Sequence, residues 1–173
     1  MATRTLQTEK NITFFITFTC FKWLNLFDLT NLYDDIYKWF DVVTKLENKL
    51  LGYVIMPNHL HALILLRDEL NTINELIAEG KKFRAWEIVK RLKEKNLNHI
   101  LKILSEGVTN SMQKKGSRHK VFTDSFDCKR CYDSNFIQQK LNYIHWNPVK
   151  AGLVPQPEDY LHSSAGFYLT EKQ

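Results

Sequence analysis

Two pairs of residues in this sequence have the types and spacing needed for metal-assisted chemistry. His59 and His61 stand two residues apart in an apolar run, and Tyr143 and Asn147 stand four apart in a run with helical spacing. Residues two apart in a strand point to one face, and residues four apart in a helix are neighbours on its surface. Imidazole nitrogens and an amide oxygen are ligands that divalent cations accept in proteins. The two pairs together therefore predict a three-ligand metal site with a tyrosine one helical turn from a ligand.

Such a site could transfer a nucleic-acid strand. Three protein ligands leave positions on the cation for water and a phosphate oxygen, so the cation can act as a Lewis acid on a phosphodiester. A tyrosine held beside that phosphate can attack it in line, and the phosphotyrosine keeps the energy of the broken bond. Each pair also has a structural explanation. The histidines could bond to backbone at a strand edge, and the tyrosine and asparagine could simply lie on the surface of a helix near its end.

The elements expected around these residues form one α+β domain over residues 1–173. Strands are predicted over 11–20, 50–56, 59–66 and 119–123, and helices over 31–49, 72–95, 97–104 and 134–146. The order strand, helix, strand, strand, helix, strand is that of a ferredoxin-like βαββαβ core with an antiparallel sheet. The added C-terminal helix would carry Tyr143, and a basic insertion is expected at about 95–118.

Further expectations concern the faces and ends of these elements. The last helix should be capped by Ser134 and should end at Pro148, because the residue before a proline is pushed out of helical geometry. The stretch 113–118 should be a basic loop, and 155–173 a surface tail. The buried side of helix 72–95 is expected to consist of Phe83, Trp86, Val89 and Leu92. The expected anchors of the tail are Tyr160, Phe167 and Tyr168.

Positive charge is concentrated in one part of the chain. Residues 80–120 hold twelve Lys or Arg against three acidic residues, whereas the whole chain carries a net charge of only +5. This asymmetry is typical of a surface that binds a polyanion such as nucleic acid. A solvated helix followed by a basic loop would give the same pattern. The candidate DNA-binding residues are Lys82, Arg84, Lys90, Arg91, Lys114, Lys115 and Arg118, with Gln139 one helical turn before Tyr143.

The cysteines and the hydropathy pattern favour a cytoplasmic protein. Three cysteines cannot all pair within one chain, and no apolar run is long enough to cross a membrane. Cys128 and Cys131 form a C-x-x-C pair, which is weak evidence for zinc without a second pair. Tyr132 is a rival nucleophile, but no ligand residue follows it at the required spacing.

Two longer motifs resemble those of a known family. The run 56–61 (MPNHLH) resembles the H-x-H motif of the HUH single-tyrosine transposases. The run 143–154 (YIHWNPVKAGLV) resembles the Y-I-x-x-N-P-V-x-x-G-L-V signature of their REP-associated branch. Ser163, Ser164 and Tyr168 resemble the S-S-x-x-x-Y ending of that branch. Phe122 is a departure, since many relatives carry tryptophan near that position, and the insertion at 95–118 is longer than in the shortest members.

The resemblance implies an activity and a role for each site residue. It implies a DNA-transposition enzyme that cuts and rejoins single-stranded DNA, often beside a folded hairpin. Tyr143 would be the nucleophile, His59, His61 and Asn147 would bind Mg²⁺ or Mn²⁺, and the products would be a 5′-phosphotyrosine and a free 3′-hydroxyl. The protein would act as a monomer or a homodimer.

Two other functions stay open from the sequence. A relative that binds DNA hairpins without cutting them would keep the basic surface and lose the chemistry. A metal-dependent hydrolase would use water in place of tyrosine, with Asp124 or Asp127 as the general base.

Overall fold

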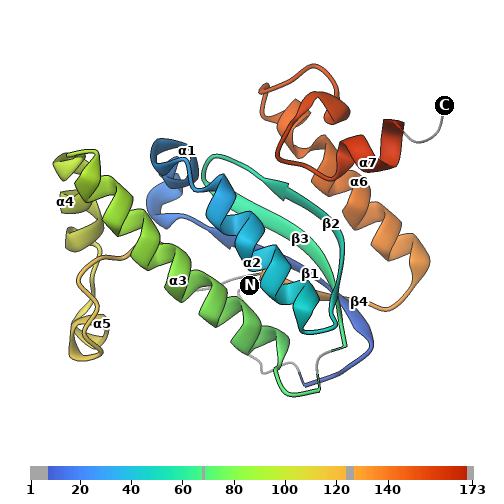
Figure 1. The fold of residues 1–173 in the computed structure, drawn as a ribbon, viewed down its shortest axis with the longest axis horizontal. Helices are drawn as coiled ribbons and strands as arrows, with labels where there is room; N and C mark the ends of the chain where they lie inside the picture. Colours follow the sequence, from blue (N-terminus) through green and yellow to red (C-terminus); the bar gives the residue numbers. More distant parts are fainter. Residues whose placement is uncertain (1–7, 68, 124–126, 171–173) are drawn as a thin grey trace.

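The fold is built on one antiparallel sheet of four strands, seen in a computed structural model that describes residues 8–67, 69–123 and 127–170. In these ranges the strands are β1 (Ile12–Thr19), β2 (Lys49–Ile55), β3 (His59–Leu66) and β4 (Asp127–Cys131). They lie in the order β2-β3-β1-β4, and each pair of neighbours is antiparallel. Because helices connect β1 to β2 and β3 to β4, the predicted ferredoxin-like βαββαβ core is confirmed (Figure 1).

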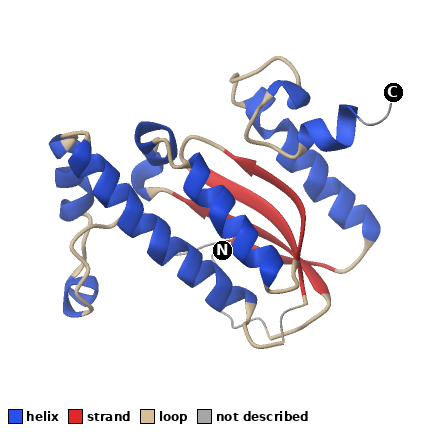
Figure 2. Ribbon diagram, viewed as in Figure 1, coloured by secondary structure: helices blue, strands red, loops and turns tan. Residues whose placement is uncertain are grey.

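The helices divide between the two faces of this sheet (Figures 1 and 2). The helical segments described are η1 (Phe21–Trp23), α1 (Leu26–Thr30), α2 (Tyr33–Lys45), α3 (Ile73–Glu94), α4 (Asn98–Glu106), α5 (Asn110–Lys114), α6 (Ser134–Lys150), η2 (Pro157–Asp159) and α7 (Ala165–Thr170). One hydrophobic core joins α2 and α3 to the sheet, and a second joins α6 to the opposite face. The helix that carries Tyr143 therefore has one face of the sheet largely to itself.

Alternation along the strands decides which side chains face α6. In β1, Phe14 and Ile16 enter the core under α2 and α3, whereas Phe15 enters the core under α6. All of β3 is buried or nearly so, because helices cover both of its faces. Leu60 joins the first core and Leu63 the second. Since residues two apart share a face, the two histidines of β3 lie on the α6 side.

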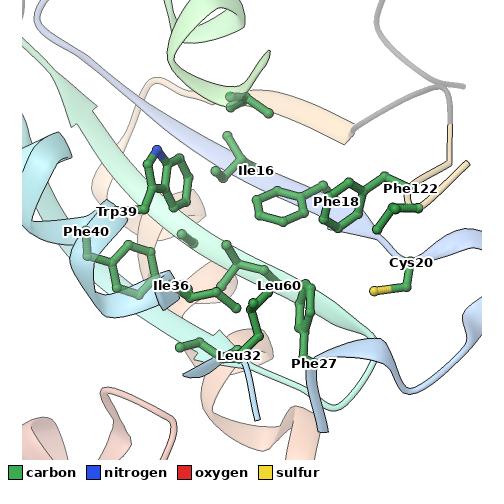
Figure 3. Packing of buried hydrophobic residues seen from close by; sticks show 14 of the residues in the cluster. Ile16, Phe18, Cys20, Phe27, Leu32, Ile36, Trp39, Phe40, Leu60 and Phe122 are labelled. Atoms are coloured by element: carbon green, nitrogen blue, oxygen red, sulfur yellow. The ribbon is translucent and has the colours of Figure 1, made fainter. Parts of the chain in front are cut away.

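Aromatic packing holds α2 on the first face. Figure 3 shows Trp39 and Phe40 of α2 directed toward Ile16, Phe18 and Leu60 of the sheet. The Trp39 and Phe18 rings meet edge to face, with centroids 5.9 Å apart. Such edge contacts add to the free energy gained from burial alone. This layer makes the sheet a rigid base for the opposite face.

The fourth strand lies later in the chain than the sequence predicts. The predicted strand at 119–123 forms only an isolated bridge between Cys20 and Phe122, and the strand is Asp127–Cys131. The error has a physical cause. Val121 and Phe122 are apolar because they fill the first core, whereas β4 pairs with β1 alone and keeps charged edge residues. Within the predicted basic loop at 113–118, residues 113 and 114 instead end α5.

The buried side of α3 also differs from the predicted one. Phe83 and Trp86 are 59% and 67% exposed, whereas Arg84 is only 8% exposed. The buried residues of α3 are Ile73, Leu76, Ile77, Gly80, Arg84, Ile88 and Leu92. Arg84 is ion-paired with Asp35 of α2. A hydrophobic pattern does not detect a buried stripe that contains a charged residue, so the pattern predicts the aromatic residues beside Arg84 to be in the core.

Helix α6 does not end at Pro148, as the sequence predicts, but continues through this proline to Lys150. Its end is a Schellman motif. Gly152 adopts a left-handed φ of 69°, its N–H donates to the Val149 carbonyl, and the Leu153 N–H donates to the Pro148 carbonyl, each over 2.9 Å. At the other end, the cap is the Asp133 carboxylate, which accepts from the Phe136 N–H, and the predicted cap Ser134 is the first helical residue. The helix therefore ends because of Gly152 and not because of Pro148.

Two of the three aromatic residues predicted to attach the segment 155–173 to the fold do contact the sheet. The hydroxyls of Tyr160 and Tyr168 donate to the carbonyls of Ile55 and Leu51 in β2, whereas Phe167 is 63% exposed. Across the described ranges, no helix has both the length and the apolar character that crossing a bilayer requires.

A close approach between α2 and α3 gives a stability prediction. A Cβ added at Gly80 would stand 2.7 Å from the indole ring of Trp39, which is 4% exposed and has no room to move. Overpacking costs about 1–3 kcal/mol, against about 1 kcal/mol from the better helix propensity of alanine. Gly80→Ala should therefore lower the free energy of unfolding in urea by about 1 kcal/mol.

The matched control is Gly166, the glycine within helix α7. A Cβ at Gly166 in α7 would meet nothing within 4 Å, so Gly166→Ala should be neutral or stabilising. Equal stability of Gly80→Ala and wild type would contradict the tight packing of α3 on Trp39.

Candidate active site

The four residues proposed for chemistry come together between β3 and α6. The rings of His59 and His61 have centroids 4.8 Å apart, and the rings of His61 and Tyr143 have centroids 5.1 Å apart. The Asn147 side chain lies near enough to His59 to influence its pKa. The histidines come from the start of β3, and the tyrosine and asparagine from one face of α6. The structure therefore brings together the four side chains that the spacing predicts to share a site.

Hydrogen bonds fix the orientation of His59. The amide nitrogen of Asn58 donates to the Trp23 carbonyl over 3.2 Å and to Asn25 Oδ1 over 3.0 Å. Its other amide atom, Oδ1, lies 2.7 Å from His59 Nδ1 and can only accept. His59 therefore carries its proton on Nδ1, which leaves the lone pair on Nε2.

His61 is held by the neighbouring strand. Thr17 stands directly opposite His61 in the β1–β3 register, and its hydroxyl lies 2.6 Å from His61 Nδ1. A hydroxyl accepts as well as donates, so it can satisfy an Nδ1 proton, and in that tautomer Nε2 of His61 is free as well. Protein histidines that bind metals almost always have the second ring nitrogen bonded in this way.

Burial keeps both imidazoles neutral. Desolvation lowers the pKa of His59 to about 4, against a smaller opposing effect of the nearby Asn147 side chain. Desolvation, with His59 and Lys140 nearby, lowers the pKa of His61 to about 3. Neutral imidazole is the form that binds metal ions. Two neutral Nε2 atoms beside an amide side chain are therefore a donor set that fits a divalent cation.

Tyr143 is packed on one side and open on the other. Its ring meets Phe15 edge to face with centroids 5.9 Å apart, and the residue is 40% exposed. The ammonium groups of Lys140 and Lys150 lie 5.9 Å and 5.7 Å from its ring centroid. The phenol is thus accessible to a large substrate and flanked by two cations.

Sequence reasoning missed Lys140, Lys150, Thr17 and Asn58. The lysines could have been found, because residues 140, 143, 147 and 150 repeat at helical spacing and share a face of α6. The role of Thr17 can be recognised only from the β1–β3 register, which the sequence alone does not give. Asn58 is next to the histidine pair, but its role depends on two acceptors from a distant loop.

A carboxylate also lies on this face of the sheet. Asp127 of β4 stands opposite Thr17, on the side of the sheet that holds His61. It lies 3.9 Å from the ammonium group of Lys129. The other carboxylate considered for a hydrolase, Asp124, lies outside the described residues.

The predicted DNA-binding residues separate into different groups. Arg84 and Arg91 have structural roles instead, because Arg84 pairs with Asp35, and Arg91 bonds to Asp34, Glu87 and the Thr30 and Asn31 carbonyls. Lys82 and Lys90 are exposed on α3, and Lys114, Lys115 and Arg118 follow α4. These four lysines and Arg118 lie on the α3 side of the sheet, opposite α6. Gln139 is exposed on α6, one turn from Tyr143.

Neither the zinc alternative nor the rival nucleophile gains support. Cys128 belongs to the core under α2 and α3 and Cys131 to the core under α6, so the sheet separates the two thiols. In the described part of the chain, no three His, Cys, Asp or Glu side chains are grouped for a metal. Tyr132 is 70% exposed, and its hydroxyl lies 3.1 Å from an Arg130 guanidinium nitrogen.

The C-terminal segment locks α6 against β2. The Ser164 hydroxyl accepts from the Tyr53 N–H over 3.0 Å and lies 3.0 Å from His145 Nε2 on α6. Ser163 forms a bridge with Val54, and Tyr168 packs against His145. The serine pair and the tyrosine noted in the sequence are thus structural residues that hold the helix of Tyr143 in place.

Comparison with solved structures finds a similar fold. The chain is similar to a REP-associated tyrosine transposase that was solved bound to a REP hairpin, with a TM-score of 0.59 and 17% sequence identity. The match covers 98% of this chain and 86% of that chain. At this identity, the likeness shows that the two chains share a fold. No protein-family profile and no curated protein matches the sequence.

The role of Ser164 can be tested by its removal. Ser164→Ala leaves His145 Nε2 and the Tyr53 N–H without their partner, and an unsatisfied buried polar group costs about 1–3 kcal/mol. The free energy of unfolding in urea should fall by about that amount. Ser105→Ala, which removes an exposed hydroxyl bonded to the Lys102 carbonyl, is the control and should change it by less than about 0.5 kcal/mol. A Ser164→Ala variant no less stable than the control would show that this contact does not hold α6.

Proposed function

We propose that this protein cuts and rejoins single-stranded DNA through Tyr143, with Mg²⁺ or Mn²⁺ bound by His59, His61 and Asn147. The observation that carries the proposal is the meeting of a half-exposed tyrosine with two neutral imidazoles and an amide. Their Nδ1 atoms are already bonded to Thr17 and Asn58, so the Nε2 atoms are available to a cation.

The proposed reaction is a reversible transfer. The Tyr143 phenol oxygen attacks the phosphorus of a phosphodiester and loses its proton. The bond between phosphorus and the 3′ oxygen breaks, and that oxygen leaves as a 3′-hydroxyl once it has gained a proton. The strand that follows stays on the protein as a 5′-phosphotyrosine. Attack by a 3′-hydroxyl reverses the exchange and rejoins a strand without any external energy source.

The protein's own residues supply positioning and charge. Lys140 and Lys150 lie beside the tyrosine ring, where their ammonium groups would attract the phosphate and stabilise negative charge that builds up on it. The edge contact with Phe15 limits the directions in which the phenol can point. A bound divalent cation would supply Lewis-acid polarisation of the phosphodiester.

The nature of the DNA is part of the proposal. The structural neighbour was solved with a hairpin, and by analogy we propose single-stranded DNA with a folded hairpin as the substrate here. An unpaired strand bends more easily than a stiff duplex, so it can bring a single phosphodiester to the Tyr143 phenol. Two outcomes compete with this proposal: a protein that binds hairpins without cutting, and a hydrolase that uses water with Asp127 as the base.

Covalent capture separates these functions. Labelled single-stranded DNA with a hairpin, incubated with Mn²⁺, should form an adduct that survives denaturation, and Tyr143→Phe should abolish it because the nucleophile is gone. Binding measured by anisotropy should change less than about threefold, since only one hydroxyl is lost. Tyr132→Phe is the control and should keep the adduct. Full adduct formation by Tyr143→Phe would refute the proposal, and cleavage that leaves a free 5′-phosphate would indicate the hydrolase.

Metal binding can be tested without any reaction. Thr17→Val removes the partner of His61 Nδ1, and loss of such a contact weakens metal affinity by about 10- to 100-fold. Calorimetric titration with Mn²⁺ should show this loss. Thr13→Val is the matched control, because Thr13 is a buried threonine on the same strand and face, four residues away. Equal Mn²⁺ affinity of the two variants would contradict the proposed ligand orientation.

A further inference from the structure

A groove runs along α3 on the side of the molecule that lacks Tyr143. One wall is α3, and the other is the segment 116–121 that follows α5. Figure 1 shows the segment after α5 returning beside α3, with α6 on the far side of the sheet. The groove residues that carry the argument are Lys82, Phe83, Trp86, Lys90, Lys93 and Arg118.

Two large aromatic side chains in this groove are exposed and do not pack in either hydrophobic core. Phe83 is 59% exposed and Trp86 is 67% exposed. They stand three residues apart and are therefore neighbours on the helix surface. Burying one such ring is worth about 1.5–3 kcal/mol, which this fold does not gain at either position. Adjacent exposed aromatic rings in a hollow are typical of a binding surface.

The charge around these rings is positive. Lys82, Lys90, Lys93 and Arg118 line the groove, and Glu94 is the only acidic lining residue among those that the structure describes. The Lys90 ammonium group lies 5.7 Å from the centre of the Trp86 ring. Lys90 is also close to Glu87 and Glu94, at 3.6 Å and 3.9 Å, so its charge is partly balanced. Lys82, Lys93 and Arg118 therefore contribute most to the attraction of an anion.

We propose that this groove binds single-stranded DNA, with bases stacked on Phe83 and Trp86 and phosphates on Lys82, Lys93 and Arg118. Aromatic platforms beside basic side chains are how proteins hold unpaired strands with little sequence preference. In a duplex the base faces are covered by stacking within the helix, so the rings would have nothing to bind. The choice of DNA as the nucleic acid rests on the proposed function; the stacking chemistry does not.

The groove would be a second DNA contact, separate from the candidate active site. The sheet lies between α3 and α6, so bases held here cannot be the ones beside Tyr143. The bound segment would be a flanking part of the same strand or a second strand. Its effect would be to retain DNA on the protein while the 3′ end is free.

The test uses the full chain with Tyr143→Phe and EDTA, so that cutting plays no part. Fluorescence anisotropy measures the affinity for a labelled oligothymidine of about 12 nucleotides. Phe83→Ala with Trp86→Ala should weaken binding at least tenfold, because each stacked base contributes about 1–3 kcal/mol. Lys93→Gln with Arg118→Gln should weaken binding and lower the salt dependence by about 0.7 per lost phosphate contact.

Matched controls are available on exposed surfaces elsewhere. Phe167→Ala removes a ring of similar exposure on α7, and Lys38→Gln removes an exposed lysine on α2. Each should change the affinity less than twofold. Because all substituted residues are exposed, melting temperatures should match that of the parent chain and confirm that the variants fold.

Several results would overturn the groove assignment. Unchanged oligothymidine affinity in the Phe83→Ala, Trp86→Ala variant is the most direct. Tighter binding of oligouridine, of a blunt hairpin or of polyglutamate than of oligothymidine would replace single-stranded DNA with another ligand. Photo-crosslinks from 5-iododeoxyuridine should map to α3, and crosslinks to α6 alone would contradict the proposal. None of these readouts depends on Tyr143, so groove binding can fail while adduct formation succeeds, or the reverse.

Discussion

The packing of α6 on the sheet is the contact on which the candidate active site depends. Leu141 and Ile144 enter the core formed with Phe15, Val54 and Leu63, and Tyr143 is carried past its edge. This packing is possible because β2 has glycine at position 52, where a Cβ would collide with the Leu141 side chain. The β2–β3 register shifts at the same place. A close helix–sheet contact therefore fixes the distance between a phenol on one element and an imidazole on another.

The second constraint is the two-residue period of β3. A slip of one residue in its pairing with β1 would turn both imidazoles into the aromatic core under α2 and α3. That core is formed by apolar side chains such as Phe18, Phe27 and Trp39. In the observed register, each Nδ1 atom has an oxygen within 2.7 Å. Burial of two polar rings is thus tolerated on one face only, and this favours the register that the candidate site needs.

Much of this arrangement could be predicted from the sequence because its signals are local. The apolar run 59–66 gives the bounds of β3, and helical spacing places Tyr143 beside Asn147. The order of elements then selects a ferredoxin-like core. The missed features depend on residues far apart in the chain. Thr17 is matched to His61 by strand register, and Asn58 is oriented by Asn25 and Trp23.

Two of the wrong predictions, those for α3 and for the fourth strand, have a common cause. In both, a tertiary contact overrides a local preference. Arg84 is buried because Asp35 of α2 pairs with it, and this turns Phe83 and Trp86 outward. Phe122 fills the first core without forming a regular strand, which leaves the polar segment at 127–131 to complete the sheet. A hydrophobic pattern read from sequence alone assigns the large aromatic residues to the core and the charged ones to the surface.

The exposure of Phe83 and Trp86 changes the character of the basic surface on the α3 side. If Phe83 and Trp86 had been core residues, the basic segment 80–120 would be a charged surface with no means to distinguish paired from unpaired DNA. Their exposure adds stacking surfaces to that charge, on the face of the sheet that the tyrosine does not use. With the two proposed sites, the sheet would separate two functions with different requirements. Metal binding and attack on the α6 side would need buried, neutral ligands and a fixed phenol, whereas DNA binding on the α3 side would need an open, positively charged surface. Placing both on one face would add the α3 lysines to Lys140 and Lys150 near the imidazoles, and this further positive charge would weaken the binding of a cation.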